Sequence, residues 1–225
     1  MVLSGTNPFF IPGPVGRLEA LLSPGQPGAT HAALICHPHP LFGGTMHNKV
    51  VYRAMKALSE FGFPALRFNF RGAGLSEGQH DQGHGEIEDA RAALNWLDAE
   101  LHLPIILCGF SFGAATGLRA ACKYHDDRVV GLISLGTPVA VEGRVYTYGF
   151  LRECAKPKLF ISGAQDQYSP EATLREVVGS LLQPKELVIV PSADHFFDGH
   201  LPEMQAAIRD WVPRHFSTIR QATAE

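Results

Sequence analysis

Residues 104–118 read PIILCGFSFGAATGL, which is an apolar run, a Gly-x-Ser-x-Gly turn and a series of small residues. The apolar run predicts a buried strand and the small residues predict a helix, so the motif falls at a strand-to-helix turn. The turn is so sharp that its serine takes a sparsely allowed backbone conformation, and bulky side chains at positions 109 and 113 would collide with it. We therefore expect Ser111 to be displayed as a nucleophile, with the amide of Phe112 at the helix N-terminus facing any oxyanion.

Length and charge favour one α/β domain over residues 1–225, with residues 221–225 as a frayed tail. Charged residues make up 18% of the chain and the formal net charge is -3, so nothing favours a nucleic-acid partner. Residues 1–16 lack the basic and apolar regions of a signal peptide, and no apolar run is long enough to span a membrane. These features predict no membrane partner and leave a homodimer open.

The four cysteines, at positions 36, 108, 122 and 154, show no paired or Cys-x-x-Cys spacing. Two of them lie in strand-like runs, where a thiol packs as a small apolar group. Cysteine usage therefore predicts a reducing, cytoplasmic location.

Strand-like and helix-like segments alternate along the chain, which is typical of a doubly wound, mostly parallel sheet with helices on both faces. The central residues of the strands are apolar without alternation, as expected of strands buried on both faces. The predicted strands are residues 32–36, 64–70, 105–108, 129–135, 158–162 and 187–190. Before them, residues 9–11 and 16–22 flank a Pro-Gly-Pro turn and predict an antiparallel hairpin at the N-terminal edge of the sheet.

Helical periodicity marks three further segments, and local signals mark their ends. The apolar positions are Val51, Met55 and Leu58 in the first, Ile87, Ala90, Leu94, Leu97 and Leu101 in the second, and Leu201, Met204, Ile208 and Trp211 in the last. Ser169 before Pro170 predicts a capped helix start with proline at the first helical position.

A serine hydroxyl needs a neutral imidazole to take its proton and a carboxylate to orient that imidazole. In an open parallel sheet such residues lie just beyond the carboxyl ends of the strands. Ser111, Asp166 and His195 each follow a predicted strand, in the chain order of an α/β-hydrolase triad. Asp194 is a rival acid, but its neighbour in sequence is the histidine itself, so it is poorly placed to reach the far ring nitrogen.

The loop at residues 37–44, HPHPLFGG, follows another strand and is placed to supply a second oxyanion amide. Its prolines have no N–H, which leaves His39, Leu41 and Phe42 as donors, and of these we favour His39 and Leu41. His37 and His39 could instead be half of a metal site, but no third ligand has suitable spacing, and we expect no metal.

Three glycines between residues 72 and 78 superficially resemble a phosphate-binding loop. The following residues do not begin a helix and the expected lysine is absent, so nucleotide binding is excluded. We interpret Arg71 as an internal hydrogen-bonding post that fixes these loops.

Four segments together resemble the α/β-hydrolase superfamily, within it the small, cap-poor bacterial serine hydrolases related to dienelactone hydrolase. They are HPHPLFGGTM at residues 37–46, LRFNFRG at 66–72, GFSFG at 109–113 and ADHFF at 193–197. The resemblance implies a cofactor-free esterase that forms an acyl-enzyme at Ser111, with Asp166 and His195 completing the triad. This chain departs from the family at Asn69, where many members carry aspartate, and at Ser111, where dienelactone hydrolases use cysteine.

Only about twenty residues separate the predicted strands 129–135 and 158–162, too few for a helical lid. This minimal cap predicts an open or shallow site for small or short-chain carboxylic esters. Aromatic side chains are expected to line its apolar pocket; they are Phe42, Phe110, Tyr146, Tyr148 and Phe196. A thioesterase, a small peptidase, a cofactor-free lyase or perhydrolase and a non-catalytic binding protein remain as alternatives, although a binding protein needs no strained serine.

Overall fold

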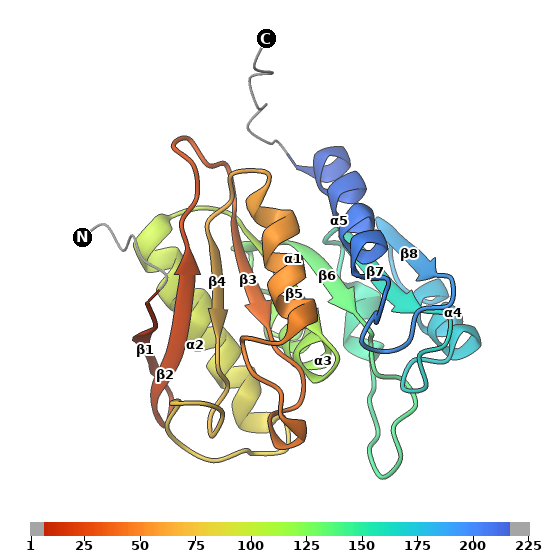
Figure 1. The fold of residues 1–225 in the computed structure, drawn as a ribbon, viewed down its shortest axis with the longest axis horizontal. Coiled ribbons are helices and arrows are strands. Elements are labelled where there is room, and N and C mark those ends of the chain that lie inside the picture. Colours follow the sequence, from red (N-terminus) through yellow and green to blue (C-terminus); the bar gives the residue numbers. More distant parts are fainter. Residues whose placement is uncertain (1–6, 217–225) are drawn as a thin grey trace.

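The computed structural model describes residues 7–216, so the predicted tail at 221–225 lies outside the described residues. One eight-stranded sheet has the order β1-β2-β4-β3-β5-β6-β7-β8 (Figure 1). The strands are β1 (Phe9–Gly13), β2 (Gly16–Ser23), β3 (Ala32–Cys36), β4 (Ala65–Phe68), β5 (Ile105–Phe110), β6 (Val129–Leu135), β7 (Lys158–Gly163) and β8 (Lys185–Val190). β1 and β2 form the predicted antiparallel edge hairpin, β2 runs antiparallel to β4, and the remaining neighbours are parallel.

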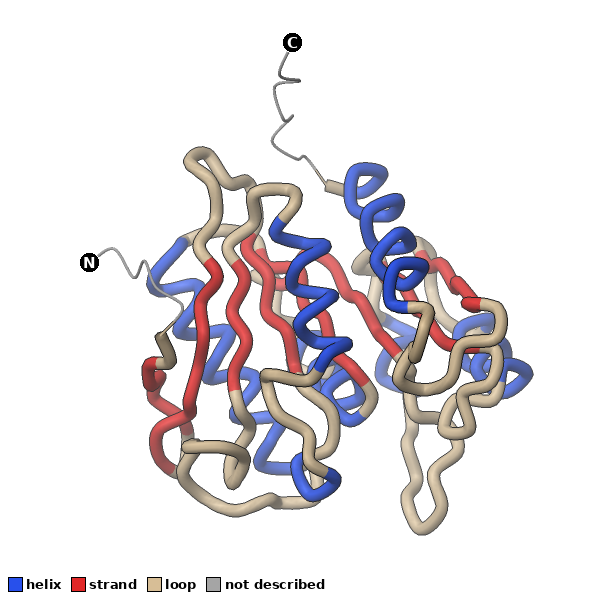
Figure 2. Tube along the Cα trace, in the orientation of Figure 1, coloured by secondary structure: helices blue, strands red, loops and turns tan. Residues whose placement is uncertain are grey.

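Within residues 7–216, five α-helices and two short 3-10 helices accompany the strands. They are η1 (Pro40–Phe42), α1 (Lys49–Ser59), α2 (His84–Leu101), α3 (Phe112–Cys122), η2 (Gly149–Glu153), α4 (Glu171–Gly179) and α5 (Leu201–His215). In Figure 2, α1 and α5 lie side by side in front of the sheet and α2 and α3 pass behind it. The predicted doubly wound α/β-hydrolase architecture is therefore confirmed.

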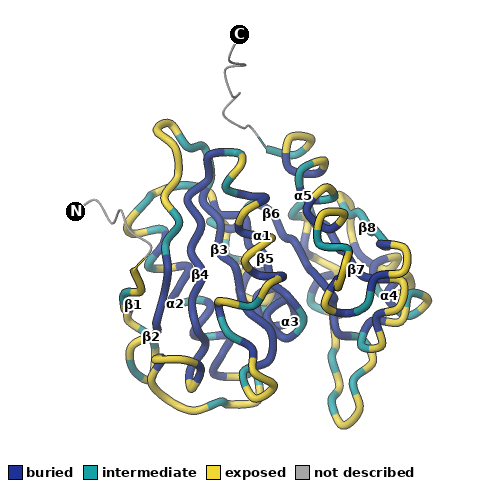
Figure 3. Tube along the Cα trace, in the orientation of Figure 1, coloured by how far each residue is buried: buried dark blue, intermediate teal, exposed yellow. Residues whose placement is uncertain are grey.

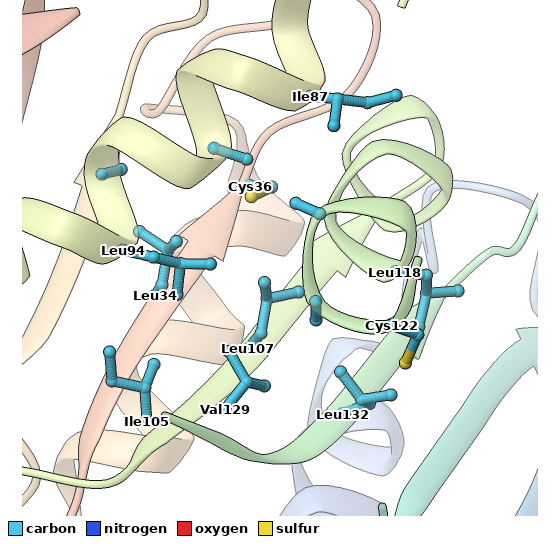
Figure 4. Packing of buried hydrophobic residues seen from close by; sticks show 14 of the residues in the cluster. Leu34, Cys36, Ile87, Leu94, Ile105, Leu107, Leu118, Cys122, Val129 and Leu132 are labelled. Carbon is cyan, nitrogen blue, oxygen red and sulfur yellow. The ribbon is translucent and has the colours of Figure 1, made fainter. Parts of the chain in front are cut away.

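Two apolar clusters, one on each face of the sheet, hold the layers together. One joins α2, α3 and α4 to the sheet and the other joins α1 and α5 to its opposite face. Figure 3 shows the central strands dark and buried, whereas exposed residues lie on loops, on outer helix faces and on the edge strand β1. In Figure 4, Leu34 of β3 and Leu107 of β5 lie between Leu94 of α2 and Leu118 of α3. Because β3 and β5 are buried on both faces, the loops that follow them start from fixed points.

One local prediction about this fold was wrong, and one contact between cysteines was not foreseen. Ser169 does not cap α4: Pro170 occupies the N-cap position, and the buried Ser169 hydroxyl has no hydrogen-bond partner among the described residues. The backbone amide of Ser169 instead donates to Asp166. Cys122 and Cys154, 32 residues apart, form a disulfide because α3 ends beside η2, with their Cα atoms 5.9 Å apart. That proximity is tertiary, so cysteine spacing gave no sign of it, and cysteine usage no longer argues for a reducing location.

The connection from β6 to β7, residues 136–157, contains η2 and an isolated bridge between Val141 and Arg144 but no α-helix. It extends past the strand arrowheads as the green loop of Figure 1. This segment, the cap loop, is as short as predicted. No helix within residues 7–216 is long and apolar enough to cross a membrane.

Candidate active site

The serine turn after β5 has the strained geometry that its sequence predicts. Ser111 has φ 55° and ψ -119°, in the positive-φ region that most side chains avoid. Its carbonyl accepts hydrogen bonds from the amides of Ala114 and Ala115, so the helix begins immediately behind it. A Cβ on Gly113 would overlap the backbone of Cys36 and His37 at the end of β3. Glycine at 113 thus lets β3 and the serine turn approach closely.

Ser111, His195 and Asp166 meet beyond the carboxyl ends of β5, β8 and β7. The Nε2 atom of His195 lies 3.0 Å from the Ser111 hydroxyl oxygen, and its Nδ1 atom lies 2.8 Å from Oδ2 of Asp166. His195 and Asp166 are 5% and 3% exposed, whereas Ser111 is half-buried and open to a cavity. The geometry allows a neutral imidazole to accept the serine proton while the carboxylate holds its Nδ1–H.

Asp166 is fixed by groups that leave one oxygen for the histidine. Its Oδ1 atom accepts the backbone amides of Tyr168 and Ser169 at 2.9 and 3.1 Å, and Oδ2 also accepts the Ser162 hydroxyl at 3.3 Å. These hydrogen bonds fix the orientation of the carboxylate. Asp166 therefore faces His195 as an oriented acceptor.

The rival acid, Asp194, has a different position. Its Oδ1 atom accepts the amides of Phe196 and Asp198, both at 3.0 Å, which closes the turn after His195. The Nδ1 atom of the imidazole is paired with Asp166 instead. Asp194 therefore shapes the loop that carries the histidine.

His37 ties the loop after β3 to the loop after β4. Its Nδ1 atom lies 2.6 Å from the carbonyl oxygen of Pro38, and its Nε2 atom accepts the amide of Phe70 at 2.9 Å. Burial lowers the pKa of His37 to about 3, so the ring is neutral with its proton on Nδ1. Both nitrogens are occupied. Within residues 7–216, no group of three or more His, Cys, Asp or Glu side chains is placed to hold a metal ion.

The sequence offered four backbone amides as oxyanion donors, those of Phe112, His39, Leu41 and Phe42, and the structure separates them. Leu41 donates its amide to Nδ1 of His39 at 3.2 Å, and Phe42 donates to the His39 carbonyl. The amides of His39 and Phe112 have no acceptor in the described part of the chain, and both residues line the cavity beside Ser111. His39 and Phe112 are thus the pair of donors that an oxyanion could use.

Hydrogen bonds from buried polar side chains fix the loops that follow β3 and β4. Asn69 accepts the Met46 amide at 2.8 Å and donates to Glu19 at 2.7 Å, so it supports the end of the glycine-rich loop after His39. The predicted post, Arg71, forms two hydrogen bonds of 2.9 and 2.7 Å to the carboxylate of Asp89. The loops after β3 and β4 are consequently tied to β2 and α2.

A cavity of about 310 Å³, here called the catalytic cavity, opens above Ser111 and His195. Of the aromatic residues predicted to line it, Phe42, Tyr146 and Phe196 do so. Phe42 and Phe196 are 82% and 42% exposed, so they form a rim rather than a closed pocket. The site is open, as the short cap loop predicts.

Two aromatic residues predicted for the pocket lie elsewhere. Phe110 is fully buried, because its side chain packs under the imidazole of His195, with ring centroids 5.0 Å apart. Tyr148 is 6% exposed and donates its hydroxyl to the carbonyl of Pro138 at 2.9 Å. Phe110 and Tyr148 therefore pack beneath the site and do not line the catalytic cavity.

Sequence reasoning missed two residues that do line the cavity. Tyr168 sets its ring edge against His195, with centroids 4.8 Å apart, and Arg144 of the cap loop contacts Nε2 of His39. Tyr168 could have been found from its place two residues after Asp166. Arg144 carried no such signal, because the course of the cap loop is set by tertiary contacts.

Comparison with known proteins agrees with this architecture. A family model described as the alpha/beta hydrolase fold matches residues 34–146. An alpha-beta serine hydrolase homologue from Coxiella burnetii is 39% identical with a TM-score of 0.85, over 94% of this chain and 100% of that one. XC6422 from Xanthomonas campestris, described as a serine hydrolase without lid, is 34% identical with a TM-score of 0.83, over 95% and 96% of the two chains.

Dienelactone hydrolase from Anabaena variabilis is 20% identical, with a TM-score of 0.76 over 94% of this chain and 98% of that one, a likeness that concerns the fold alone. The family model ends before Asp166 and His195, yet the structure brings both to the serine inside the matched segment. This chain belongs to the alpha/beta hydrolase family, and its most similar relatives described here are serine hydrolases.

Proposed function

We propose that this hydrolase cleaves small or short-chain carboxylic esters through an acyl-enzyme on Ser111. One observation carries the proposal: the Ser111 hydroxyl, His195 and Asp166 form a continuous hydrogen-bonded line that opens into a cavity beside two unused backbone amides. A nucleophile, its base, the orienting acid and oxyanion donors are the set that acyl transfer requires.

In the first half-reaction, the oxygen of Ser111 forms a bond to the ester carbonyl carbon while Nε2 of His195 takes the hydroxyl proton. The carbonyl oxygen becomes an oxyanion, which the amides of His39 and Phe112 stabilise. The intermediate then expels the alkoxide, which takes the proton from His195 and leaves as an alcohol. Asp166 stabilises the imidazolium throughout.

In the second half-reaction, water attacks the acyl carbon and gives a proton to His195. The bond to the serine oxygen breaks, the proton returns to Ser111, and the carboxylic acid leaves. No cofactor is needed for either half, because every proton that leaves one group is accepted by another. An acyl-enzyme therefore accounts for hydrolysis with the residues present.

Preference for short chains follows from the size and shape of the catalytic cavity. About 310 Å³ lies at the small end of the range for ligand pockets, and exposed Phe42 and Phe196 form an open apolar rim. A long acyl chain would leave most of its surface in water. A small acyl group would bury a larger share of its surface in the cavity.

The test is a panel of 4-nitrophenyl esters and acyl thioesters of increasing acyl length, assayed with wild type and with Ser111→Ala. We expect kcat/KM to be highest for short acyl esters and the variant to lose turnover. Asp194→Asn is the control variant, because it changes a residue of the loop that carries His195 without changing a member of the triad. Faster cleavage of the thioesters than of every ester in the panel would contradict the substrate class and leave the role of Ser111 as nucleophile unaffected.

The cytoplasmic location, the absence of nucleic-acid and membrane partners and the homodimer stay predictions from the sequence.

A further inference from the structure

A second cavity, of about 670 Å³, adjoins the catalytic cavity. It lies between the start of α2, the first turns of α3 and the cap loop. The two cavities share Phe112, Arg144 and Tyr146 in their walls. A short substrate attacked at Ser111 can therefore place a polar group against Arg144, at the border of this second space.

The lining of the second cavity is basic, although the chain has a formal net charge of -3. It includes two arginines and two histidines, namely Arg119, Arg144, His80 and His84, and no aspartate or glutamate. The carboxylate of Glu86, which pairs with the cavity-lining His80, has zero exposure and accepts the amides of Asp81 and Gly83. It faces the protein interior and His80 rather than the cavity.

Arg144 is the charge that both cavities share. In the part of the chain that the structure describes, its guanidinium forms no ion pair, and its polar contact is with Nε2 of His39. Burial first, and then the charge of Arg144, lowers the pKa of His39 to about 4, so at neutral pH the ring brings no second positive charge. Glu142 lines the catalytic cavity but is exposed and forms no ion pair within residues 7–216.

Arg119 differs from Arg144 because its guanidinium is held by hydrogen bonds to the protein itself. Its Nη2 atom donates to the carbonyl and hydroxyl of Thr147, at 2.8 and 3.3 Å, and Nη1 donates to the Ala115 carbonyl. It anchors the cap loop to α3 and adds positive potential to the second cavity. Arg144 is left as the donor that a ligand can reach.

We propose that the preferred ester carries an anionic group, which Arg144 binds where the two cavities meet. The inference rests on the proposed function and names its substrate class. A guanidinium presents paired N–H donors that match the two oxygens of a carboxylate, so an anionic oxyacid group is the ligand that this site fits. Arg144 also contacts His39, whose amide faces the oxyanion, so binding of the anion places the ester carbonyl near Ser111.

The carboxylate can belong to the acyl part or to the leaving alcohol, and two matched substrate pairs distinguish these sources. The first pair is mono-4-nitrophenyl adipate and its neutral terminal amide. The second is 4-carboxyphenyl butyrate and 4-carbamoylphenyl butyrate. Within each pair size is kept and charge changes, and the spontaneous rate of each substrate is subtracted.

The variants are Arg144→Gln and Arg144→Lys, with Arg175→Gln as a matched arginine control on the exposed face of α4. In wild type we expect kcat/KM to favour the anionic member of at least one pair by about 10- to 100-fold, as for a hydrogen-bonded charge pair. The preference should vanish in Arg144→Gln, chiefly through KM, and return in part in Arg144→Lys. It should fall at raised ionic strength, and Arg175→Gln should keep it.

Equal kcat/KM for the two members of both pairs in wild type would overturn the inference, as would a preference retained in Arg144→Gln. Neutral esters would still be cleaved in either case, so the proposed function would stand. Failure to cleave any of the four substrates would overturn the proposed function and this inference together.

Discussion

Replacement of Asp166 by asparagine tests how the structure orients the base. Oδ1 of Asp166 accepts two backbone amides, so the carbonyl oxygen of an asparagine takes that position and its NH2 group faces Nδ1 of His195. A donor there forces the imidazole proton onto Nε2. That tautomer cannot accept the proton of Ser111.

The expected loss follows from this wrong tautomer. Where a triad aspartate is changed to asparagine with its geometry kept, kcat falls by roughly 10,000-fold, or about 5.5 kcal/mol of barrier. A flipped amide would restore the tautomer but point two N–H donors at the amides of Tyr168 and Ser169, which costs about 1–3 kcal/mol for each unsatisfied group. We therefore expect a decrease in kcat of about 1,000- to 10,000-fold with KM little changed.

The assay is initial-rate hydrolysis of 4-nitrophenyl acetate by wild type, Asp166→Asn and Asp194→Asn, with thermal unfolding as a check on folding. Asparagine at 194 keeps an oxygen for the amides of Phe196 and Asp198, so that variant should lose less than about tenfold. Abolished turnover in Asp194→Asn with normal turnover in Asp166→Asn would refute the assignment.

Three further predictions concern the supports of the site. Asp89→Ala leaves the buried Arg71 guanidinium unpaired, so it should lower the free energy of unfolding in urea by about 3–5 kcal/mol. The control Arg175→Gln breaks an exposed pair and should lower it by less than about 1 kcal/mol. Equal losses would contradict the stabilising role of the buried Arg71–Asp89 pair. Gly113→Ala should destabilise by about 1–3 kcal/mol and reduce kcat, because its Cβ overlaps the end of β3; a fully active variant would show that the close approach is not needed. His37 stays neutral in the folded protein down to its pKa of about 3, but it titrates near 6.5 in the unfolded chain. Lowering the pH from 6.5 towards 3 should therefore reduce the free energy of unfolding by up to about 1.4 kcal/mol per pH unit. In urea unfolding at several pH values, His37→Gln should show a smaller dependence of that free energy on pH, and an unchanged dependence would contradict this account.

Much of the fold follows from local sequence. The strands at 32–36 and 129–135 have the bounds that their apolar runs predict, because strands buried on both faces need continuous apolar residues. The serine turn and the residues just past β7 and β8 were also found from sequence. Parallel strands bring their carboxyl ends to one edge, so position along the chain translates into proximity.

The features that sequence missed depend on contacts between distant segments. Phe110 and Phe112 flank the same serine, yet one packs under His195 and the other lines both cavities, because the turn directs their side chains to opposite sides. The Leu41 amide turns to the His39 ring, a local bond that no residue pattern indicated. Arg144 and the disulfide of Cys122 depend on the path of the cap loop, which carries little periodicity of its own.

The central claim is that Ser111 is an activated nucleophile, and covalent labelling tests it most directly. Folded wild type is treated with a fluorophosphonate, beside Ser111→Ala, and the modified peptide is identified by mass. We predict one adduct per chain, on Ser111, at a rate that drops sharply in Asp166→Asn, and no adduct in Ser111→Ala. Folded wild type that stays unlabelled, or that is labelled at another residue, would contradict the account.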